Sequence, residues 1–344
     1  MDKAVSARVA VLGAGLVGAY VGGRLAAAGT EVTLVGRRRV LDDLRANGLR
    51  VTDLTGADLA VPGERLTLTD DPRALGEADL ILLAVKSPAT DDAACEIDKF
   101  ARPGAVVVSL QNGVSNADQL RRALPAMTVI AGMVPFNVAR LGPGHYHRGT
   151  GGQVHVDDHP AIAAHAPLFE AAGLPLVLSS DMTAVLWGKL LINLNNAINA
   201  LSGLPLREQF GQRDFRRCLA LSQQEALGLL RRARIRPGPV LGVPASLVPH
   251  VMRLPDRLYA KVAARSGARV DRHARSSMAE DLAMGRRTEV DYLNGEVVAL
   301  AGRLGRRAPV NARIVELVRR AEAGGETWAA ADLYRELSAA RASA

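Results

Sequence analysis

The feature that most constrains the fold is a glycine motif, GAGLVG at residues 13–18, that directly follows a short apolar run. The run at residues 8–12 has the β-branched, continuously apolar character of a strand buried on both faces. Small residues then extend to a natural helix end at Gly29, and a second apolar run occupies residues 31–35. A strand, a glycine turn, a helix and a strand within about 30 residues predict one βαβ unit.

Each glycine of the motif has a physical role in binding a dinucleotide. Gly13 makes the turn, Gly15 lets a pyrophosphate approach the backbone, and Gly18 lets the helix pack on the strand. Leu16 and Val17 begin the helix, whose N-terminus directs the positive end of its dipole at the phosphates. We therefore assign these five residues to cofactor binding. A merely glycine-rich turn is the alternative, and the strands on both sides of the motif argue against it.

Further apolar runs predict the rest of the first domain. Helix-length or turn-rich segments separate these runs, and this alternation is typical of a parallel, doubly wound Rossmann-type sheet. The glycine- and histidine-rich stretch at residues 142–152 is expected to be a loop or hairpin. The expected strands lie at residues 65–69, 80–85, 105–110, 127–133, 154–156 and 176–178.

Helical patterns dominate after about residue 180, so we expect a dinucleotide-binding domain over residues 1–180 and an all-helical substrate domain over residues 181–344. One helix is expected to begin at Ser180 or Asp181 and to end near Gly203. Another is expected to begin at Thr288, because Thr288 and Asp291 have capping-box spacing. The fold class predicted is therefore α/β, followed by a helical C-terminal domain.

The composition narrows the possible partners. Lys and Arg outnumber Asp and Glu by 43 to 35, which favours an anionic ligand. The basic residues are scattered beside acids and only 3% of residues are aromatic, so a nucleic-acid surface is not expected. No apolar stretch approaches the roughly 18 to 20 uninterrupted residues of a membrane helix. The expected partner is a small molecule, with no nucleic acid and no membrane.

The cysteines and histidines suggest neither disulfides nor a metal. Cys95 and Cys218 are far apart and lack partner spacing, which fits a reducing cytoplasm. The apolar N-terminal run resembles an export signal, but its clustered glycines are better explained by the nucleotide motif. A His-rich surface hairpin is the preferred interpretation of the four histidines, and no metal is expected. They are His145, His147, His155 and His159.

The end of the second predicted strand usually sets the choice of cofactor. An acid there would bond the ribose 2′-hydroxyl of NAD, but this chain has Arg37, Arg38 and Arg39 after Gly36. Guanidinium groups pair with a 2′-phosphate, so we expect NADPH, with Arg37 as its ligand. A solvated basic turn is the alternative.

Two polar residues follow later strands of the predicted sheet. Lys86 follows the run at residues 80–85, and Asn112 follows the run at residues 105–110. Both therefore belong to the carboxyl edge of the sheet, where open α/β sheets bind ligands. A surface lysine and an ordinary Asn-Gly turn are the alternatives.

A polar stripe marks the first helix of the second domain. Lys189, Asn193 and Asn196 stand at i, i+4 and i+7 and would share one face of a continuous helix. The other faces are apolar, so the helix is expected to be buried, and a buried polar stripe needs partners or a ligand. A polar network between helices is the structural alternative.

Over almost its full length the chain resembles the ketopantoate reductases, or 2-dehydropantoate 2-reductases. Several spaced motifs in order are more specific than any one of them. The matching segments are VLGAGLVG, the arginine-bearing end of the second strand, ILLAVK with Lys86, LQNG with Asn112, LWGKLLIN with Lys189 and Asn193, SSM with Ser277, and TEVDYLNG with Glu289.

The resemblance implies an oxidoreductase that uses NADPH to reduce the 2-oxo group of 2-dehydropantoate to pantoate, in pantothenate and coenzyme A biosynthesis. It implies that Lys189 is the general acid and that Glu289 binds the substrate hydroxyl. A reduced carbonyl develops alkoxide character, which an ammonium neutralises and protonates. Lying near a predicted helix N-terminus, Glu289 is expected to be held ionised by the helix dipole.

The remaining roles are carried over from the same resemblance. Arg37 matches the ligand of the 2′-phosphate, and Lys86 a cofactor-side residue that also approaches the substrate. Asn112 is assigned to both cofactor and substrate. The other substrate-side residues are Asn193 and Ser277.

Two departures from the family pattern fall in the expected substrate pocket. Ala197 stands eight residues after Lys189, where a second Asn is usual, and on helical geometry Asn196 is the better substitute. Ala274 stands three residues before Ser277, where many members have Asn. The alternatives left open are a reductase of a different 2-oxo acid and a non-catalytic NADPH-sensing module. A monomer or a homodimer is expected.

Overall fold

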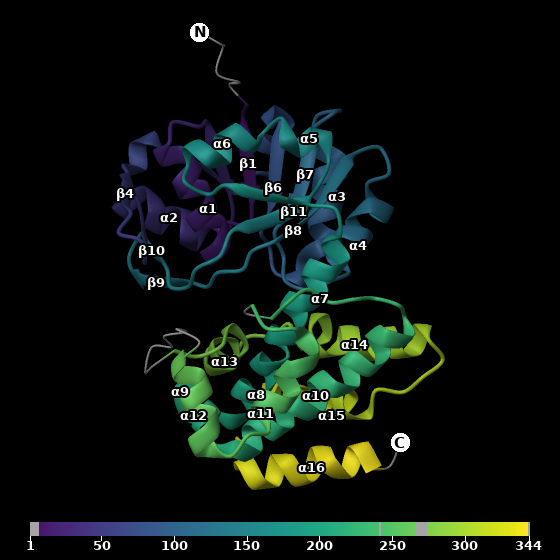
Figure 1. Cartoon of the computed structure of the whole chain (residues 1–344). Coiled ribbons are helices and arrows are strands. Elements are labelled where there is room, and N and C mark those ends of the chain that lie inside the picture. Colours follow the sequence, from purple (N-terminus) through teal and green to yellow (C-terminus); the bar gives the residue numbers. More distant parts are fainter. Residues whose placement is uncertain (1–6, 241, 266–273, 343–344) are drawn as a thin grey trace. The chain divides into compact units, whose positions relative to one another are not determined.

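The computed structural model describes residues 7–240, 242–265 and 274–342 (Figure 1). The chain divides into two compact units, Met1–Met182 and Thr183–Ala344. Each unit has its own core and is described by itself below.

The first unit is built on an eight-stranded sheet with the order β12-β11-β8-β7-β6-β1-β2-β5. Neighbouring strands are parallel except β11, which is antiparallel to β8. The chain moves from β1 outward through β2 to β5 and then crosses to β6 on the other side of β1, which places the topological switch point between β1 and β6. The strands are β1 (Val9–Leu12), β2 (Val32–Val35), β5 (Thr67–Thr69), β6 (Leu80–Leu83), β7 (Val106–Ser109), β8 (Thr128–Met133), β11 (Val154–Asp157) and β12 (Leu176–Ser179).

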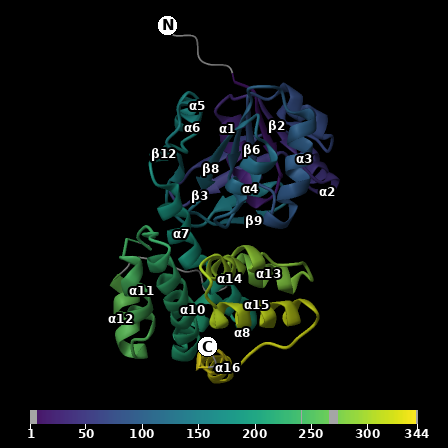
Figure 2. The ribbon, with the colours of Figure 1, turned by 90° about the vertical axis from the view of Figure 1, so that its right-hand side faces the viewer.

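Apolar clusters cover both faces of this sheet, as the buried strand pattern requires. On one face Val11 and Leu82 pack with residues of α1, α2, α5 and α6, and on the other Leu12 and Leu83 pack with residues of α3 and α4. Figure 2 shows α5 and α6 on one side of the sheet and α3 on the other. The predicted doubly wound fold is therefore confirmed. These helices are α1 (Leu16–Ala27), α2 (Arg38–Asn47), α3 (Thr90–Phe100), α4 (Asn116–Ala123), α5 (Pro160–Ala163) and α6 (Ala166–Ala171).

A second, four-stranded sheet with the order β4-β3-β10-β9 was not expected in full. The stretch expected as a loop or hairpin contains part of the antiparallel β9–β10 pair, but β3 and β4 were missed. The second sheet packs against α1, where a Cβ on Gly23 would lie 2.8 Å from a Val51 methyl. Its strands are β3 (Leu49–Asp53), β4 (Asp58–Val61), β9 (Val138–Gly142) and β10 (His145–Arg148); 3₁₀ turns η1 (Gly63–Arg65), η2 (Pro72–Glu77) and η3 (Ser87–Ala89) complete the unit.

Helices are the regular structure of the described residues of the second unit, and loops and an isolated bridge between Val240 and Val243 connect them. The longest helix, α10, contacts several others and lies between α11 and α15 in Figure 2. Together with the sheet domain, this confirms the predicted fold class. The helices are α7 (Met182–Asn193), α8 (Asn195–Ser202), α9 (Leu206–Gly211), α10 (Arg213–Arg232), α11 (Val248–Met252), α12 (Asp256–Arg265), α13 (Ser277–Ala283), α14 (Asn294–Arg303), α15 (Pro309–Glu322) and α16 (Ala330–Ala342), with 3₁₀ turns η4 (Ala245–Leu247) and η5 (Val290–Tyr292).

Two helix predictions in this unit need correction. The helix expected to reach Gly203 divides at Leu194 into α7 and α8, although Gly203 is the left-handed residue at the end, with φ 66°. No α-helix begins at Thr288; the next one, α14, begins at Asn294. The capping box does not form there: the Thr288 N–H donates to Glu322 Oε1 at 2.7 Å, and Asp291 pairs with Arg319.

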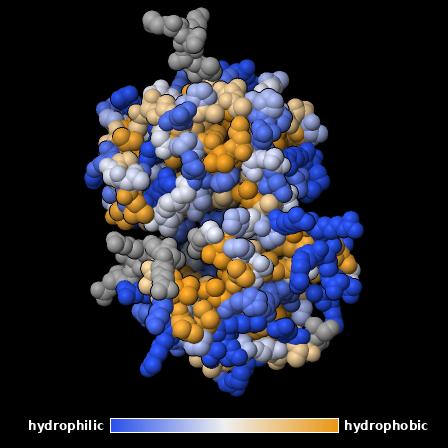
Figure 3. Space-filling view, in the orientation of Figure 1, coloured by the Kyte–Doolittle hydropathy of each residue, from blue (hydrophilic) through white to orange (hydrophobic). Residues whose placement is uncertain are grey.

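Among the residues that the structure describes, no helix is both long and apolar enough to cross a bilayer. On the face shown in Figure 3, apolar patches are separated by hydrophilic side chains.

Candidate active site

The three motif glycines meet different surroundings in the turn between β1 and α1. Gly13 has φ 107°, and a Cβ there would lie 2.6 Å from the Val85 nitrogen. A Cβ on Gly18 would lie 2.1 Å from the Gly13 carbonyl oxygen. A Cβ on Gly15 would meet nothing within 4 Å. Gly13 and Gly18 are therefore required by the fold itself, whereas Gly15 leaves open space at the start of α1.

The first turn of α1 suits an anionic group. Gly15 is the N-cap residue without a side-chain cap, and the turn contains no acidic residue. The first N–H groups of a helix have no partner within the helix, so Leu16 and Val17 supply donors at its positive end. Leu16 is 39% exposed, so this end of the helix is open to solvent. The open space beside Gly15 would accommodate a pyrophosphate.

Arg37 lies next to this turn. A Cβ on Gly36 would lie 2.8 Å from the Ala14 Cβ, so the end of β2 is held against the glycine motif. Arg37 follows as the exposed N-cap residue of α2. Arg38 pairs with Asp70 at 3.1 Å, whereas no ion pair between described residues involves Arg37. Its guanidinium is thus available to a ligand.

The structure brings Lys86 and Asn112 to adjoining loops. Strands β6 and β7 are parallel neighbours, and both residues follow them at the carboxyl edge. The Ser87 hydroxyl donates to the Asn112 carbonyl oxygen at 3.0 Å, which ties the two loops together. Both Lys86 and Asn112 are exposed, and Val85 contacts the position of Gly13. The glycine turn, Lys86 and Asn112 therefore lie at the same carboxyl edge of the sheet, at or beside its switch point.

A buried polar network beneath these loops escaped the sequence analysis. The Thr90 hydroxyl donates to the Ser87 carbonyl oxygen at 2.7 Å and accepts from Gln111 Nε2 at 2.8 Å. Asn116 Nδ2 donates to the Ser87 hydroxyl at 3.2 Å. Thr90, Gln111 and Asn116 are all buried, so the network fixes the loops that carry Lys86 and Asn112. Polar residues clustered at the ends of two buried strands were the available signal.

In the second unit, Lys189 lies in the mainly apolar helix α7 and is half-buried. Burial lowers the pKa of its ammonium to about 8. Near neutral pH such a group is mostly protonated and yet gives up its proton more readily than an ordinary lysine. Asn193 follows one helical turn later and is buried. Lys189 therefore has the properties of a general acid.

The structure also brings Asn196 and Ser277 close together. The Ser276 hydroxyl donates to the Asn196 carbonyl oxygen at 3.2 Å, and Ser277 is the next residue, at the start of α13. Asn196 is half-buried and Ser277 exposed. The predicted stripe on one continuous helix is wrong for Asn196, because the helix divides at Leu194 and Asn196 lies on α8 while Lys189 lies on α7.

Glu289 is buried, but the surroundings differ from those expected. It is the N-cap residue of the short turn η5, and α14 begins five residues later. The expectation that the dipole of a helix starting at Thr288 acts on Glu289 is therefore wrong. Thr288, its neighbour, is anchored to Glu322 at the end of α15.

The two family departures occupy different surroundings. Ala197 is fully buried in α8, so its position belongs to the core of the helical unit. Ala274 is half-buried, and its carbonyl oxygen accepts from the Leu206 N–H at 2.8 Å.

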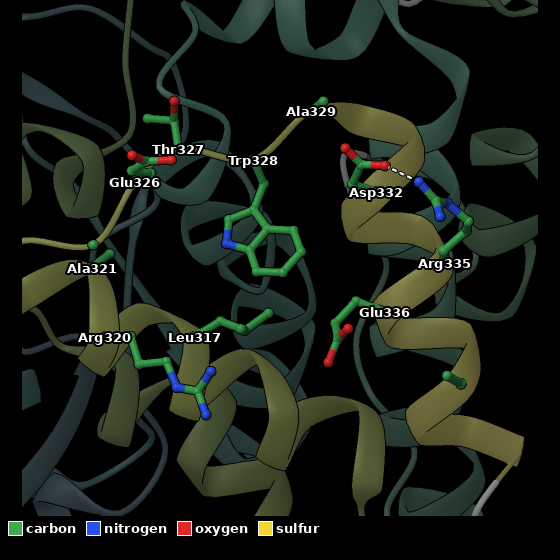
Figure 4. Close-up of a pocket in the computed structure, with 12 residues that line it drawn as sticks. Leu317, Arg320, Ala321, Glu326, Thr327, Trp328, Ala329, Asp332, Arg335 and Glu336 are labelled. Atoms are coloured by element: carbon green, nitrogen blue, oxygen red, sulfur yellow. Dashed lines mark hydrogen bonds and ion pairs between the residues drawn. The ribbon is translucent and has the colours of Figure 1, made fainter.

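A pocket of about 790 Å³ lies between α15 and α16 and contains none of the predicted site residues (Figure 4). Trp328 is one of the residues that line it, and most charged side chains around it are already paired. Asp332 pairs with Arg335, Arg320 with Glu316, and Glu336 with Arg313 at 2.6 Å. This pocket is therefore not part of the candidate active site.

A glycine turn at the switch point of a Rossmann-type sheet is typical of dinucleotide-binding proteins, and in this chain a helical unit follows it. The family model described as "Ketopantoate reductase PanE/ApbA" matches residues 9–161, and its C-terminal counterpart matches residues 181–322. The chain belongs to the ketopantoate reductase family.

Individual relatives agree with this assignment. A 2-dehydropantoate 2-reductase of Halobacterium salinarum is 31% identical over 329 residues, covering 92% of this chain and all of that protein. The crystal structure of a ketopantoate reductase of the family from Ralstonia eutropha has a TM-score of 0.78 at 33% identity, covering 92% of this chain and 99% of the other. A D-mandelate dehydrogenase, solved with NADH and anilino(oxo)acetate, has a TM-score of 0.73 at 20% identity over 92% of this chain and 99% of its own, and shares the fold.

Proposed function

We propose that this protein uses NADPH to reduce the 2-oxo group of 2-dehydropantoate to pantoate, in pantothenate and coenzyme A biosynthesis. The observation that carries the proposal is Lys189, a lysine of pKa about 8 on α7, in a chain of the ketopantoate reductase family. The assignment of cofactor binding to residues 1–180 and of catalysis to residues 181–344 is part of the same proposal.

The residues of the first unit fit NADPH. The space beside Gly15 and the donor-rich start of α1 suit the pyrophosphate, and Arg37 suits the 2′-phosphate. Lys86 and Asn112 would contact the cofactor from the neighbouring loops. NADPH, when bound, supplies the hydride that reduces C2 of the substrate.

The residues of the second unit would handle the substrate and the proton. As the carbonyl oxygen at C2 gains negative charge, the Lys189 ammonium donates a proton to it. The Glu289 carboxylate would accept a hydrogen bond from the substrate hydroxyl. Ser277, Asn193 and Asn196 would donate to the carboxylate or the reacting oxygen, and Lys86 and Asn112 would complete the substrate contacts.

A reductase of another 2-oxo acid is the second candidate, because Ala274 and Ala197 replace asparagines common in the family. Ala274 is half-buried and near the start of α13, so of the two departures it is the one closer to the proposed substrate residue Ser277. A non-catalytic NADPH sensor is disfavoured by the retention of Lys189 and Glu289.

We also propose where the protein works and with what partners. Both Cys95 and Cys218 are free thiols, which suits a reducing cytoplasm. The partner is a small 2-oxo acid, and the protein is a monomer or a homodimer.

A kinetic panel tests the proposal. Oxidation of NADPH and NADH is followed by absorbance with 2-dehydropantoate and with alkyl 2-oxo acids of similar size. The proposal expects the highest kcat/KM for 2-dehydropantoate with NADPH. A higher value for another 2-oxo acid would select the second candidate, and NADPH binding without turnover of any acid would select the sensor.

A further inference from the structure

The helical unit contains a cluster of buried polar side chains that the proposed reaction does not use. The cluster comprises Asn195 and Asn199 on α8, Gln209 on α9 and Ser276 before α13. Asn199 and Gln209 are 0% exposed. Burying amides is costly unless each is hydrogen-bonded, so the pattern of their bonds should reveal what they hold together.

Gln209 joins α9 to α8 by a reciprocal amide pair. Its Nε2 donates to Asn195 Oδ1 at 2.8 Å, and its Oε1 accepts from Asn195 Nδ2 at 3.2 Å. The same Oε1 accepts from Asn199 Nδ2 at 3.3 Å. Gln209 therefore fixes the orientation of both asparagine amides.

Asn199 passes this orientation on to α13. Its Nδ2 also donates to the Leu204 carbonyl oxygen at 2.9 Å, while its Oδ1 accepts the Ser276 backbone N–H at 2.9 Å. The donors and the acceptor of this amide are thus engaged within the protein. Asn199 is accordingly not arranged to contact a substrate.

Ser276 receives this contact at a position between two candidate substrate residues. Its hydroxyl donates to the Asn196 carbonyl oxygen at 3.2 Å and accepts the Ala279 N–H at 3.2 Å, as the N-cap of α13. Ser277 is the next residue. Helix α13 has only seven residues, too few to be stable without tertiary anchors. The bond from Ser276 to Asn199 is such an anchor.

We propose that Asn199, oriented by Gln209, is a positioning residue that fixes the junction of α8 and α13 and thereby holds Asn196 and Ser277 toward one substrate. This inference rests on the proposed function. It predicts that losing the Asn199 acceptor weakens substrate binding, while proton donation by Lys189 and cofactor binding are maintained.

Asn199→Leu is the main test, because it keeps a similar volume and removes the amide. An unsatisfied Ser276 N–H should raise KM for the 2-oxo acid by about 5-fold to 150-fold, with kcat changed less than about 3-fold and the Kd for NADPH unchanged. Asn199→Asp keeps an acceptor for Ser276 but replaces the donor to Leu204 and Gln209 by a second carboxylate oxygen, so it should recover the affinity only at a pH that protonates this carboxyl.

A stability-matched control separates positioning from simple destabilisation. Leu337→Ala removes a fully buried side chain from α16, which carries no proposed site residue. It should lower Tm, with KM unchanged below the transition. If Asn199→Leu also lowers Tm but leaves KM at the wild-type value, Asn199 has a structural role only and the proposal is overturned.

Amide hydrogen exchange provides an arm that needs no turnover. Exchange of residues 276–279 should quicken at least about 5-fold in Asn199→Leu and remain at the wild-type rate in Leu337→Ala. Unchanged exchange in Asn199→Leu would overturn the inference. Failure of the proposed function would show differently, as absence of 2-dehydropantoate reduction by the wild-type protein, and the KM arm then uses the 2-oxo acid that the panel selects.

Discussion

The two groups of candidate residues are built in opposite ways. In the first unit, Gly13, Gly15 and Gly18 lie within six consecutive positions, and the surroundings of each are set by one turn and the strands beside it. In the second unit, Asn196 and Ser277 are 81 positions apart and are linked by the hydrogen bond from the Ser276 hydroxyl to the Asn196 carbonyl oxygen. A local motif reveals its geometry directly, whereas a site assembled from distant helices depends on a network that has to be found.

Loss of the proposed general acid should give the largest effect and tests whether the second unit carries the chemistry. Lys189→Ala should lower kcat by roughly 10² to 10⁴, because the alkoxide loses its proton donor. The affinity for NADPH should change much less. Single-turnover kinetics with NADPH give the chemical rate, and fluorescence titration gives the cofactor affinity.

Lys261→Ala, at an exposed position of α12, is the matched control and should leave kcat unchanged. The wild-type rate should also fall as the pH rises through about 8, where the Lys189 ammonium deprotonates. If Lys189→Ala loses only substrate affinity and retains its turnover number, Lys189 is a binding residue and another group donates the proton.

The next effect belongs to the first unit and tests whether its local motif extends to cofactor choice. Arg37→Ala should weaken NADPH binding by about 10-fold to 150-fold, the value of one charge-assisted hydrogen bond, and leave NADH nearly unchanged. Equilibrium titration of each cofactor measures the two affinities.

Arg39→Ala, with the same loss of charge two residues later, serves as the control because Arg39 is also exposed. It should have little effect on the ratio of the two affinities. Equal losses of NADPH and NADH in Arg37→Ala would refute a role at the 2′-phosphate.

The same contrast explains how much the sequence could predict. The main sheet was predicted because its strands are continuously apolar runs such as Leu80–Leu83, a pattern that only burial on both faces explains. Strands β3 and β4 were missed because they mix polar residues with apolar ones and are half-exposed. Strand β3 pairs with β10, whose residues lie about 95 positions further along the chain, and β4 is held in the sheet through β3; no local pattern records this long-range pairing.

In the helical unit, propensity could not locate the interruption at Leu194 or the start of α14. At Thr288 a tertiary contact replaces the expected helix start, because its N–H donates to Glu322. The predicted polar stripe did not include Asn199, which lies off the face of Lys189 on a continuous helix. The structure makes it the link between α8 and α13.

Acid should destabilise the first unit through Asp53, an effect on folding rather than on chemistry. Buried Arg24 pairs with Asp53 at 3.0 Å and also donates to the Ala172 carbonyl oxygen, which joins α1 to β3 and to the end of α6. Although burial opposes it, hydrogen bonds from Thr55, Ala57 and Arg24 lower the pKa of Asp53 to about 2.

The folded pKa of Asp53 lies below its unfolded value, so its stabilisation is complete above about pH 4 and is lost as the pH falls from about 4 to about 2. The contribution is about 2 kcal/mol.

Asp53→Asn should therefore lower the free energy of unfolding near pH 6, and the difference from wild type should shrink with acid. Asp58→Asn, in an exposed pair with Arg50, is the control with a smaller effect. Urea unfolding at several pH values measures both, and a pH-independent difference for Asp53→Asn would contradict the pairing argument.

The smallest effect is expected at the proposed substrate site, whose residues come from distant parts of the chain and should distinguish between substrates weakly. Ala274 supplies no polar side chain where many family members have Asn, so the hydroxyl end of the substrate should be distinguished less strictly. An apolar surface discriminates weakly, whereas a site built to hydrogen-bond a hydroxyl strongly rejects an analogue without it. We expect 2-dehydropantoate and an alkyl 2-oxo acid of similar size to differ by less than about 10³ in kcat/KM.

Ala274→Asn should widen that gap by about 2-fold to 12-fold, the value of one neutral hydrogen bond. Ala274→Leu, which adds volume without a donor, controls for pocket size. A wild-type preference above about 10⁴ that Ala274→Asn does not change would mean that Glu289, Asn196 or another residue already recognises the hydroxyl, as a site built to bond it would.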